Sequence, residues 1–336
     1  MEKRQREYLF DNYKVLLIVL VVIGHFIEPC YDQNPFLYEL KWGIVAFHMP
    51  AFIFISGYFS KKVPSMKKLV SGLVIPYFVY EVVYYLLYTC VLDKETGLYF
   101  TRPKFTLWYL LALCVWRVAA PVAKKIPCNL LLSLAAGLAV GLFGIGNFLS
   151  IPRIVFFFPF FLAGMEFDSA WLLRFRSRKG YLGALGIMAG MAVFLFTDRY
   201  HRRLPVKIFY GRYSYEELEL PPVEGMMIRI VCYGISFLLI YLFMLVLPTD
   251  KKSYSYLGER TMAVYIFHGL IYSCLKYRSS VLEAVKSNEE SVLLILFSIA
   301  VVWVVSRKPF VRITDKIAHL QPRTLPGKDI DRSITS

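Results

Sequence analysis

The chain has 336 residues, of which 57% are hydrophobic and 19% are charged, and its formal net charge at pH 7 is +15. A soluble domain of this size cannot bury so much apolar side chain, so the composition excludes an ordinary soluble protein and indicates one that crosses a lipid bilayer several times. The basic residues form short clusters between apolar runs, as orienting loop charges do, which excludes nucleic acid as the expected partner.

Ten apolar runs are long enough, or nearly long enough, to span a bilayer as helices. With the N-terminus in the cytoplasm, most clusters of lysine and arginine fall on the cytoplasmic side, as the positive-inside rule requires. We therefore predict an all-α polytopic membrane protein with about ten transmembrane helices and both termini inside. The predicted runs are 14–31, 42–60, 69–92, 105–120, 128–148, 151–167, 180–197, 225–248, 261–277 and 291–306.

The first run contains polar residues at helical spacing. Lys14 and His25 are about 1100° apart on a helix, so they lie within roughly 20° of one face and about 16 Å apart along the axis. Asp11 and Glu28 fall within about 60° of the same face. Lipid cannot satisfy these groups, so this face must contact protein or water. His25 is therefore the first candidate functional residue.

Two more histidines lie within apolar runs. Pro50 follows His48 by two residues, and a proline at that place disrupts a helix and frees backbone carbonyls beside a cavity. His268 follows Tyr265 by three residues, so the two share a helix face. Each histidine either lines a cavity or hydrogen-bonds a neighbouring helix. The histidines lack metal-ligand spacing within any one helix, and we expect no metal.

Two further motifs have ordinary structural alternatives. Ser56 precedes Gly57, and a glycine there allows close packing of helices. Trp108 and Tyr109 suit an aromatic belt at the membrane interface as well as a cavity wall.

The basic segment from about Asp198 to Glu224 is the exception to the orientation rule. It falls on the outer side, together with four tyrosines and a short acidic run. Long translocated loops escape the charge rule, so this segment is either a solvated hairpin or a lid that meets a substrate at the outer mouth. At the other end of the chain, residues 309–336 read as a frayed cytoplasmic tail that follows the transmembrane domain of residues 1–308.

The Lys14-x10-His25 pattern resembles the arginine/lysine-x10-histidine signature of the acyltransferase-3 membrane family, and the most similar subgroup is its fucose 4-O-acetylase-like branch. The resemblance covers essentially the whole chain, in order. It continues through the blocks at residues 47–58, 75–77, 107–110, 157–164 and 261–268.

The resemblance implies an O-acyltransferase, usually an O-acetyltransferase, in the bacterial cytoplasmic membrane. Such an enzyme takes an acyl group from coenzyme A, with acetyl-CoA as the usual donor, on the cytoplasmic side and passes it to a hydroxyl of a cell-envelope or exported glycan on the outer side. Lys14 and His25 would form the core pair, with His25 in catalysis. Lys14 would attract anionic groups of the donor, and neutral imidazole is a suitable base near pH 7. Whether His25 acts as a base or carries the acyl group stays open.

These considerations give the candidate site residues. Glu28, or Asp11, would orient or tune polar neighbours of His25, and we group Glu28 with the catalytic residues. The candidates for contact with the substrate are Asp11, His48, Ser56, Trp108, Tyr265 and His268.

The coenzyme A site departs from the family pattern. The family often has an R-x-x-R motif before the Pro-Tyr of the third span, but this chain has Leu69 and Gly72 at those positions. A diffuse positive mouth would then hold the cofactor. Its candidate residues are Lys14, Lys61, Lys67 and Lys68, and the basic cluster at 174–179 is the alternative.

Two other functions remain open at this point. A transporter or flippase would also need a polar cavity between broken helices, but it has no reason to bind a coenzyme A thioester. A catalytically inactive sensor or partner subunit with the same fold would keep the histidines without turnover.

Overall fold

The structure, a computed structural model, describes residues 7–62, 65–197 and 204–320. These residues form helices and loops, with no strand among them. Short 3₁₀ and π-helical turns connect the α-helices. The α-helices are α1 (Tyr8–Phe26), α2 (Pro35–Val45), α3 (His48–Tyr58), α4 (Met66–Leu69), α5 (Ile75–Leu86), α6 (Trp108–Ala123), α7 (Asn129–Ala139), α8 (Ile151–Glu166), α9 (Ser169–Phe175), α10 (Arg178–Thr197), α11 (Pro222–Val246), α12 (Thr261–Arg278), α13 (Asn288–Val305) and α14 (Lys308–Ala318).

Seven helical segments among the described residues are long and apolar enough to cross a membrane. Two shorter apolar helices, Trp108–Ala123 and Asn129–Leu142, accompany them. Each of the ten runs predicted from the sequence overlaps a helix of the structure. The chain is thus an all-helical, multi-pass type of membrane protein, while the count of ten spans and the orientation stay predictions. The seven segments are Tyr8–Phe26, Pro35–Tyr58, Met66–Val91, Phe148–Glu166, Arg178–Thr197, Pro222–Val246 and Asn288–Val305.

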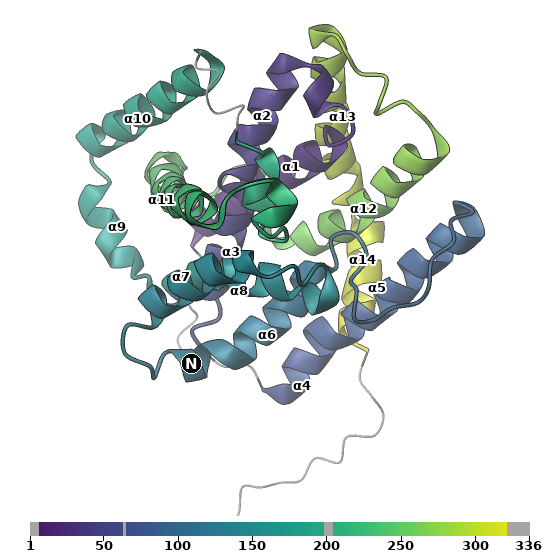
Figure 1. Cartoon of the computed structure of the whole chain (residues 1–336), viewed down its shortest axis with the longest axis horizontal. Helices are drawn as coiled ribbons and strands as arrows, with labels where there is room; N and C mark the ends of the chain where they lie inside the picture. Colours follow the sequence, from purple (N-terminus) through teal and green to yellow (C-terminus); the bar gives the residue numbers. More distant parts are fainter. Residues whose placement is uncertain (1–6, 63–64, 198–203, 321–336) are drawn as a thin grey trace, which may run out of the picture.

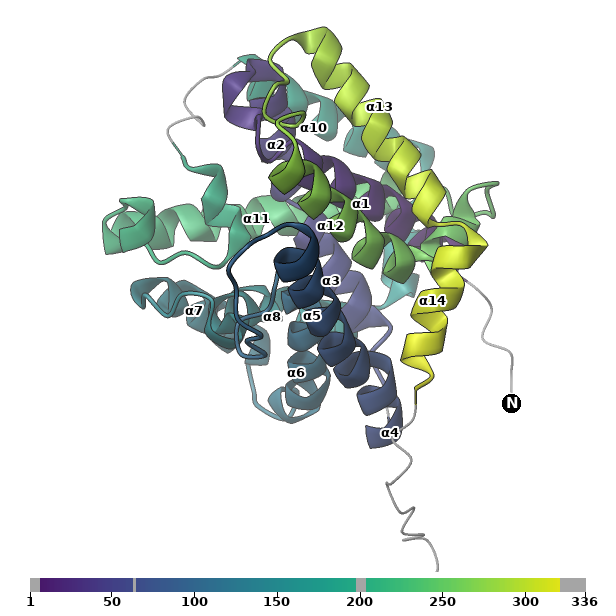
Figure 2. The same cartoon turned by 90° about the vertical axis from the view of Figure 1, so that its right-hand side faces the viewer.

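Helix α1 lies inside the bundle, with α2, α3, α11, α12 and α13 around it (Figures 1 and 2). Its first turns are held by the segment before α12. The Asn12 side chain donates to the carbonyls of Pro248 and Asp250 at 2.9 and 3.0 Å, and it accepts from the Ser255 hydroxyl at 2.6 Å. Asn12 is 1% exposed, so these bonds satisfy a polar group that would otherwise be costly to bury. They fix the register of α1 against the bundle.

The predicted span 42–60 is interrupted. Helix α2 ends at Val45 and α3 begins at His48, with Phe47 outside helical geometry at φ −142°. Pro50 is the third residue of α3, where its missing N–H is tolerated because the first N–H groups of a helix have no intrahelical partner. The disruption expected from Pro50 is therefore present, and it lies just before the histidine.

Helices α3 and α8 are in backbone contact. A Cβ atom on Gly57 would lie 2.0 Å from the carbonyl oxygen of Phe161, and one on Gly164 would lie 1.9 Å from that of Phe54. No other residue fits at either place, so the close approach predicted from Gly57 is confirmed.

Gly164→Ala is expected to lower the free energy of unfolding by about 1–3 kcal/mol, because the added methyl group must push two packed backbones apart. The midpoint of thermal unfolding in detergent measures this loss. Gly183→Ala in α10 is the matched control, since a Cβ there meets nothing within 4 Å. Equal midpoints for the two variants would contradict the packing argument.

The predicted tail begins as a helix. Helix α14 starts at Lys308, the last residue of the predicted transmembrane domain, and packs against α12 and α5 (Figure 2). Its Phe310 ring lies 4.9 Å from that of Phe267, and Thr314, one turn further, is buried. The expectation of a frayed tail is wrong for residues 309–318, because apolar residues at helical spacing give this segment a face to bury. Residues 321–336 lie outside the described part of the chain.

Candidate functional site

A cavity of about 540 Å³ follows the polar face of α1. Lys14, His25 and Glu28 all line it, as their helical spacing predicts. The fourteen residues from Lys14 to Glu28 correspond to a rise of about 21 Å, much of the thickness of a hydrocarbon core. The cavity therefore has a Lys14 end and a Glu28 end, with His25 between them.

The Lys14 end is basic. The Lys14 ammonium lies 3.0 Å from the Asp11 carboxylate and 5.5 Å from the centre of the Phe59 ring. Asp11 is buried and does not line the cavity, so it acts on Lys14 and not on a ligand inside. Arg117 of α6 lines the cavity too, and its Nε donates to Ser60 at 3.2 Å.

His25 lies against a wall of rings. The centre of its ring is 4.8 Å from that of Phe105, 5.4 Å from that of His268 and 6.2 Å from that of Tyr272. The side chain is partly exposed, and the exposed part borders the cavity. Among the described residues, no group hydrogen-bonds to its ring nitrogens. A molecule inside the cavity can therefore bond to them.

His48 also lines the cavity, and the helix break fixes its ring. Its Nδ1 lies 2.7 Å from the carbonyl oxygen of Ile44, the last turn of α2. Because a carbonyl only accepts, Nδ1 carries the proton and Nε2 of the neutral ring carries the lone pair. His48 is therefore suited to accept a hydrogen bond from a hydroxyl.

The other predicted contacts divide into two groups. Ser56, Trp108 and Tyr265 line the cavity, and the Ser56 hydroxyl is 2.6 Å from that of Tyr109. Trp108 and Tyr109 are each 8% exposed, so the interfacial belt is the wrong alternative for them.

His268 does not line the cavity; it is fully buried, behind His25. Its Nδ1 bonds to the carbonyl of Val264 at 2.7 Å, and its Nε2 has no hydrogen-bond partner among the described residues. Any influence of His268 on a ligand therefore passes through its neighbours.

Three of the four candidate cofactor lysines lie outside the cavity. Lys61 donates to the carbonyl of Phe167 at 2.5 Å and lies 4.3 Å from the centre of the Tyr58 ring. Lys67 and Lys68 are exposed on the short helix α4. Lys61 follows Phe59, which lines the Lys14 end, by two residues, whereas Lys67 and Lys68 follow it by eight and nine.

The Glu28 end holds a pair that the sequence prediction missed. Lys41 of α2 is 3% exposed, forms an ion pair with Glu28, and donates to the Gly24 carbonyl at 2.5 Å. Because α1 ends at Phe26, the Gly24 carbonyl has lost its usual backbone partner, and the lysine replaces it. Lys41 stands one residue before a predicted span, where it reads as an ordinary loop charge.

The segment that the sequence left open as a solvated hairpin or a lid contributes residues to this end of the cavity, and we call its described part, residues 204–221, the lid. The Tyr210 hydroxyl donates to Glu28 at 2.7 Å, and Arg212 and Tyr213 line the cavity beside it. Burial and the adjacent Glu28 carboxylate raise the pKa of Tyr210 well above its usual range, so it remains a donor at physiological pH. The earlier part of this segment, with His201, lies outside the described residues.

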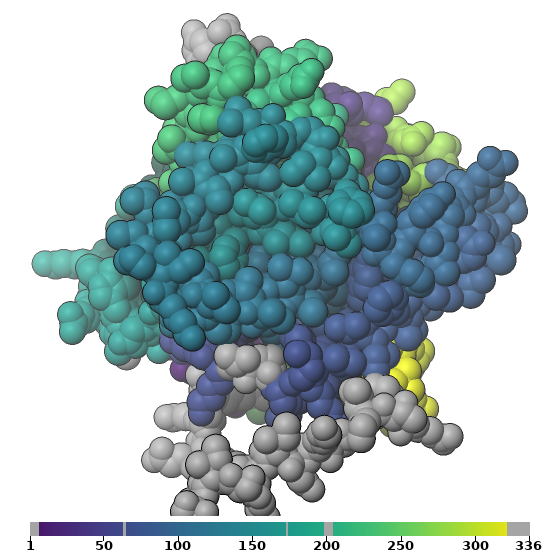
Figure 3. Space-filling model, turned by 60° about the horizontal axis from the view of Figure 1, so that its bottom comes forward, coloured from purple at the N-terminus to yellow at the C-terminus, as the bar shows by residue number. Residues whose placement is uncertain are grey.

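Buried Arg229 of α11 holds the lid segment in place. Its guanidinium donates to the carbonyls of Tyr213, at 2.9 Å, and of Gly137 in α7, at 3.2 Å. The Tyr215 hydroxyl donates to the Leu138 carbonyl at 2.7 Å. In Figure 3 the teal surface of α7 and α8 lies beside the green segment that leads into α11. The lid is therefore attached to α7 and α11.

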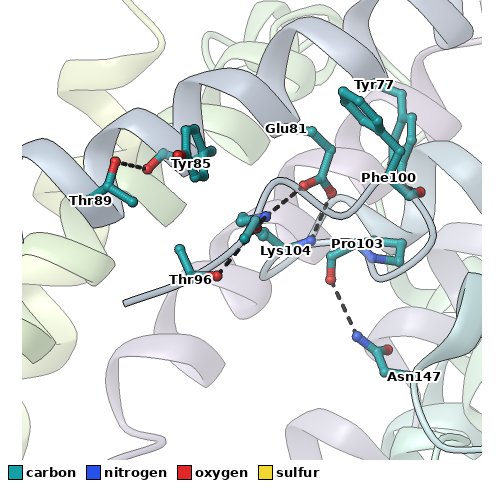
Figure 4. Close-up of polar contacts among 10 residues, drawn as sticks. Tyr77, Glu81, Tyr85, Thr89, Thr96, Phe100, Pro103, Lys104 and Asn147 are labelled. Carbon is teal, nitrogen blue, oxygen red and sulfur yellow. Dashed lines mark hydrogen bonds and ion pairs between the residues drawn. The ribbon is translucent and has the colours of Figure 1, made fainter. Parts of the chain in front are cut away.

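A loop between α5 and α6 lines the cavity with Pro103, Phe105 and Thr106, and Figure 4 shows the contacts between Glu81 and Lys104 that hold it. Glu81 of α5 accepts from the Lys104 backbone N–H at 2.8 Å, and its carboxylate is 3.6 Å from the Lys104 ammonium. Both side chains are buried. The next residue, Phe105, has the unusual φ of +46° and packs on His25. Glu81 therefore positions the loop that covers the imidazole.

Glu81→Gln is expected to lower the free energy of unfolding by about 1–3 kcal/mol, because the amide still accepts from Lys104 N–H but leaves a buried ammonium without its carboxylate. Thermal unfolding in detergent measures the change, and Glu95→Gln, at an exposed place in the same loop, is the control. Adding Lys104→Met to Glu81→Gln should restore part of the loss. A double variant less stable than either single one would contradict the pairing.

The structure also bears on whether side chains of the protein could bind a metal ion. Among the described residues, no group of three or more histidine, cysteine, aspartate and glutamate side chains could hold a metal ion.

Comparison with known proteins gives one match. A family model described as an acyltransferase domain, Acyl_transf_3, matches residues 7–307. No curated protein and no solved structure matches the chain. The matched range contains all the residues that line the cavity and ends just before α14.

Proposed function

The chain belongs to the Acyl_transf_3 family of membrane acyltransferases, and we propose that it moves an acyl group, most simply acetyl, from cytoplasmic acyl-CoA to a hydroxyl of a cell-envelope or exported glycan. The family membership supports the transfer of an acyl group, and the donor, the acceptor and the likeness to the fucose 4-O-acetylase branch are our inferences. The observation that supports them most is the cavity along α1, which extends from Lys14 to Glu28 with the imidazole of His25 on its wall.

The Lys14 end suits the donor. Lys14 and Arg117 place two cations at this end of the cavity. Positive charge at a concave entrance attracts the phosphates of coenzyme A, as point charges in the case of lysine. The thioester arm would then extend about 16 Å along α1 to reach His25. In this proposal the Lys14 end faces the cytoplasm.

The Glu28 end suits the acceptor. Here the Glu28 carboxylate is already shared by Lys41 and Tyr210, so its role is to hold α1, α2 and the lid together at the mouth. Further in, His48 Nε2 and the Ser56–Tyr109 pair offer hydrogen-bonding groups to a sugar hydroxyl. A glycan hydroxyl that enters this end would meet the thioester beside His25.

The chemistry then follows from the position of the imidazole. The neutral His25 ring takes the proton of the hydroxyl while the oxygen attacks the thioester carbonyl. The carbon–sulfur bond breaks, and the imidazolium returns the proton to the departing thiolate of coenzyme A. In the covalent alternative, His25 takes the acyl group first and the hydroxyl removes it in a second step. Labelled acyl-enzyme formed without acceptor would select the covalent route.

Proteoliposomes that contain the purified protein test the proposal. Labelled acetyl-CoA is added on one side and a panel of glycans on the other, and the labelled glycan ester is measured. We expect ester formation together with saturable binding of acetyl-CoA. Glycan movement without acetyl-CoA binding would identify a carrier instead, and acetyl-CoA binding without any transfer would favour an inactive subunit.

A further inference from the structure

At the Glu28 end of the cavity, the basic side chains outnumber the acidic side chains that could neutralise them. Lys41, Arg153 and Arg212 line this end, and Glu28 is the only carboxylate among the described residues that line the cavity. Glu28 forms its ion pair with Lys41. Neither Arg153 nor Arg212 has a carboxylate partner within the described ranges. Two arginines therefore border the cavity without a counter-charge from those residues.

The place of Arg153 suits it for binding a ligand. It is half-buried in the first turn of α8, with its Cζ 4.9 Å from the centre of the Trp108 ring. Its other contact is weak, a 3.5 Å approach of Nη1 to the Asn147 side-chain oxygen. A guanidinium has five N–H donors in a rigid plane, so most of them remain for a ligand. A planar group stacked on an indole is already ordered for binding a carboxylate or phosphate with two bonds.

Arg212 approaches the same place from the lid. Its Cζ lies 4.7 Å from the centre of the Tyr213 ring, and Arg212 and Arg153 both line the cavity. Two like charges in a partly buried site are unfavourable unless an anion neutralises them. An α8 residue and a lid residue thus both offer positive charge to an anion inside the cavity.

The phosphates of coenzyme A do not account for this site. In the proposed function they stay at the Lys14 end, and Arg212 follows Tyr210, which bonds to Glu28 at the opposite end. The fourteen positions from Lys14 to Glu28, along α1 and the turn after it, separate the two ends by about 20 Å. The anion must then be part of the second substrate.

We propose that Arg153 and Arg212 form an anion subsite, and that the acceptor carries a carboxylate or phosphate close to the hydroxyl that receives the acyl group. The inference rests on the proposed function for the direction in which the acceptor enters. Its ligand class is an acidic sugar or a sugar phosphate.

Binding without turnover tests the subsite apart from the reaction. The purified full-length protein is heated in detergent with methyl glucuronide, glucose 1-phosphate or methyl glucoside, and the unfolding midpoint is measured. Ligands that bind the folded state raise this midpoint. We expect the two anionic sugars to raise it and the neutral one to leave it unchanged, with a larger effect of the carboxylate or of the phosphate identifying the preferred group. Equal effects of all three sugars, or no effect of either anionic sugar, would overturn the proposal.

Variants then assign the effect to the arginines. Arg153→Gln and Arg212→Gln should each weaken binding of the preferred anionic sugar about tenfold or more, the size expected for one charged hydrogen bond. Arg153→Lys keeps the positive charge but loses the planar, two-point hydrogen bonding of the guanidinium. It should recover part of the lost binding, and this recovery would show that Arg153→Gln does not act through a folding defect. Arg278→Gln is the matched control, because Arg278 is exposed and pairs with Asp93 outside the cavity. Unchanged affinity in both glutamine variants would overturn the assignment.

Turnover assays distinguish failure of the anion-subsite proposal from failure of the proposed function. With acetyl-CoA as donor, Arg153→Gln should raise the KM for an anionic acceptor and leave the KM for acetyl-CoA unchanged. A preference for succinyl-CoA over acetyl-CoA that disappears in Arg153→Gln would place the anion on the acyl group and overturn the acceptor assignment. No transfer from any donor, with anionic-sugar binding intact, would refute the acyltransferase and not the anion subsite.

Discussion

His25→Ala lowers the rate of acyl transfer by about 10²–10⁴-fold, the contribution of a positioned general base, while binding of acetyl-CoA persists. The expected loss is in kcat because His25 lies well inside the cavity, about 16 Å from Lys14, where the anionic part of the donor would bind. Initial rates and equilibrium binding of labelled acetyl-CoA on the same preparation measure the two effects.

The folded state should tolerate this change. No described residue hydrogen-bonds to the His25 ring, so removal of the ring leaves no buried polar partner unpaired, and the thermal midpoint should shift little. His319→Ala is the matched control, because His319 is an exposed histidine just past α14 and outside the cavity. If His25→Ala kept the full rate, the imidazole would have no part in the chemistry and the proposed mechanism would fail.

Lys41→Met is expected to lower the free energy of unfolding by about 3 kcal/mol, the lower end of the usual cost of leaving one member of a buried ion pair alone, because the Glu28 carboxylate that remains is partly exposed. Lys41 is buried, and it holds both Glu28 and the Gly24 carbonyl at the end of α1. The midpoint of thermal unfolding measures the loss. Transfer activity should fall with it, since Glu28 also holds the lid through Tyr210.

A second variant separates the pair from simple loss of a side chain. Lys41→Met with Glu28→Gln removes both charges and should recover much of the stability, though not the Gly24 bond. Lys252→Met is the exposed control, because the ion pair of Lys252 with Asp250 lies at the surface and should contribute little. Equal stability of the buried and exposed variants would mean that the pair does not hold this end of α1.

The sequence reveals which residues of the site share a face of one segment more readily than it reveals which residues of different helices meet. Lys14 and His25 lie on one helix, and Glu28 lies in the turn that directly follows it, so arithmetic at 100° per residue finds their common face without any knowledge of neighbours. His268 shows the limit of that arithmetic. It shares a helix with Tyr265, yet Tyr265 lines the cavity and His268 is buried, because the turn of α12 against α1 and the Phe105 loop decides which side faces inward.

By itself, the sequence determined the all-helical membrane class, the polar face of α1 and a helix disruption near Pro50, since composition, periodicity and one proline act within a single segment. Only the tertiary structure decided that Lys41, Arg153 and Arg212 meet at the Glu28 end. These residues come from α2, α8 and the lid, up to 171 positions apart in the chain from Lys41 to Arg212. Local rules fix which residues share a face of one helix, whereas the packing of whole helices fixes which faces meet, and no local pattern encodes that choice.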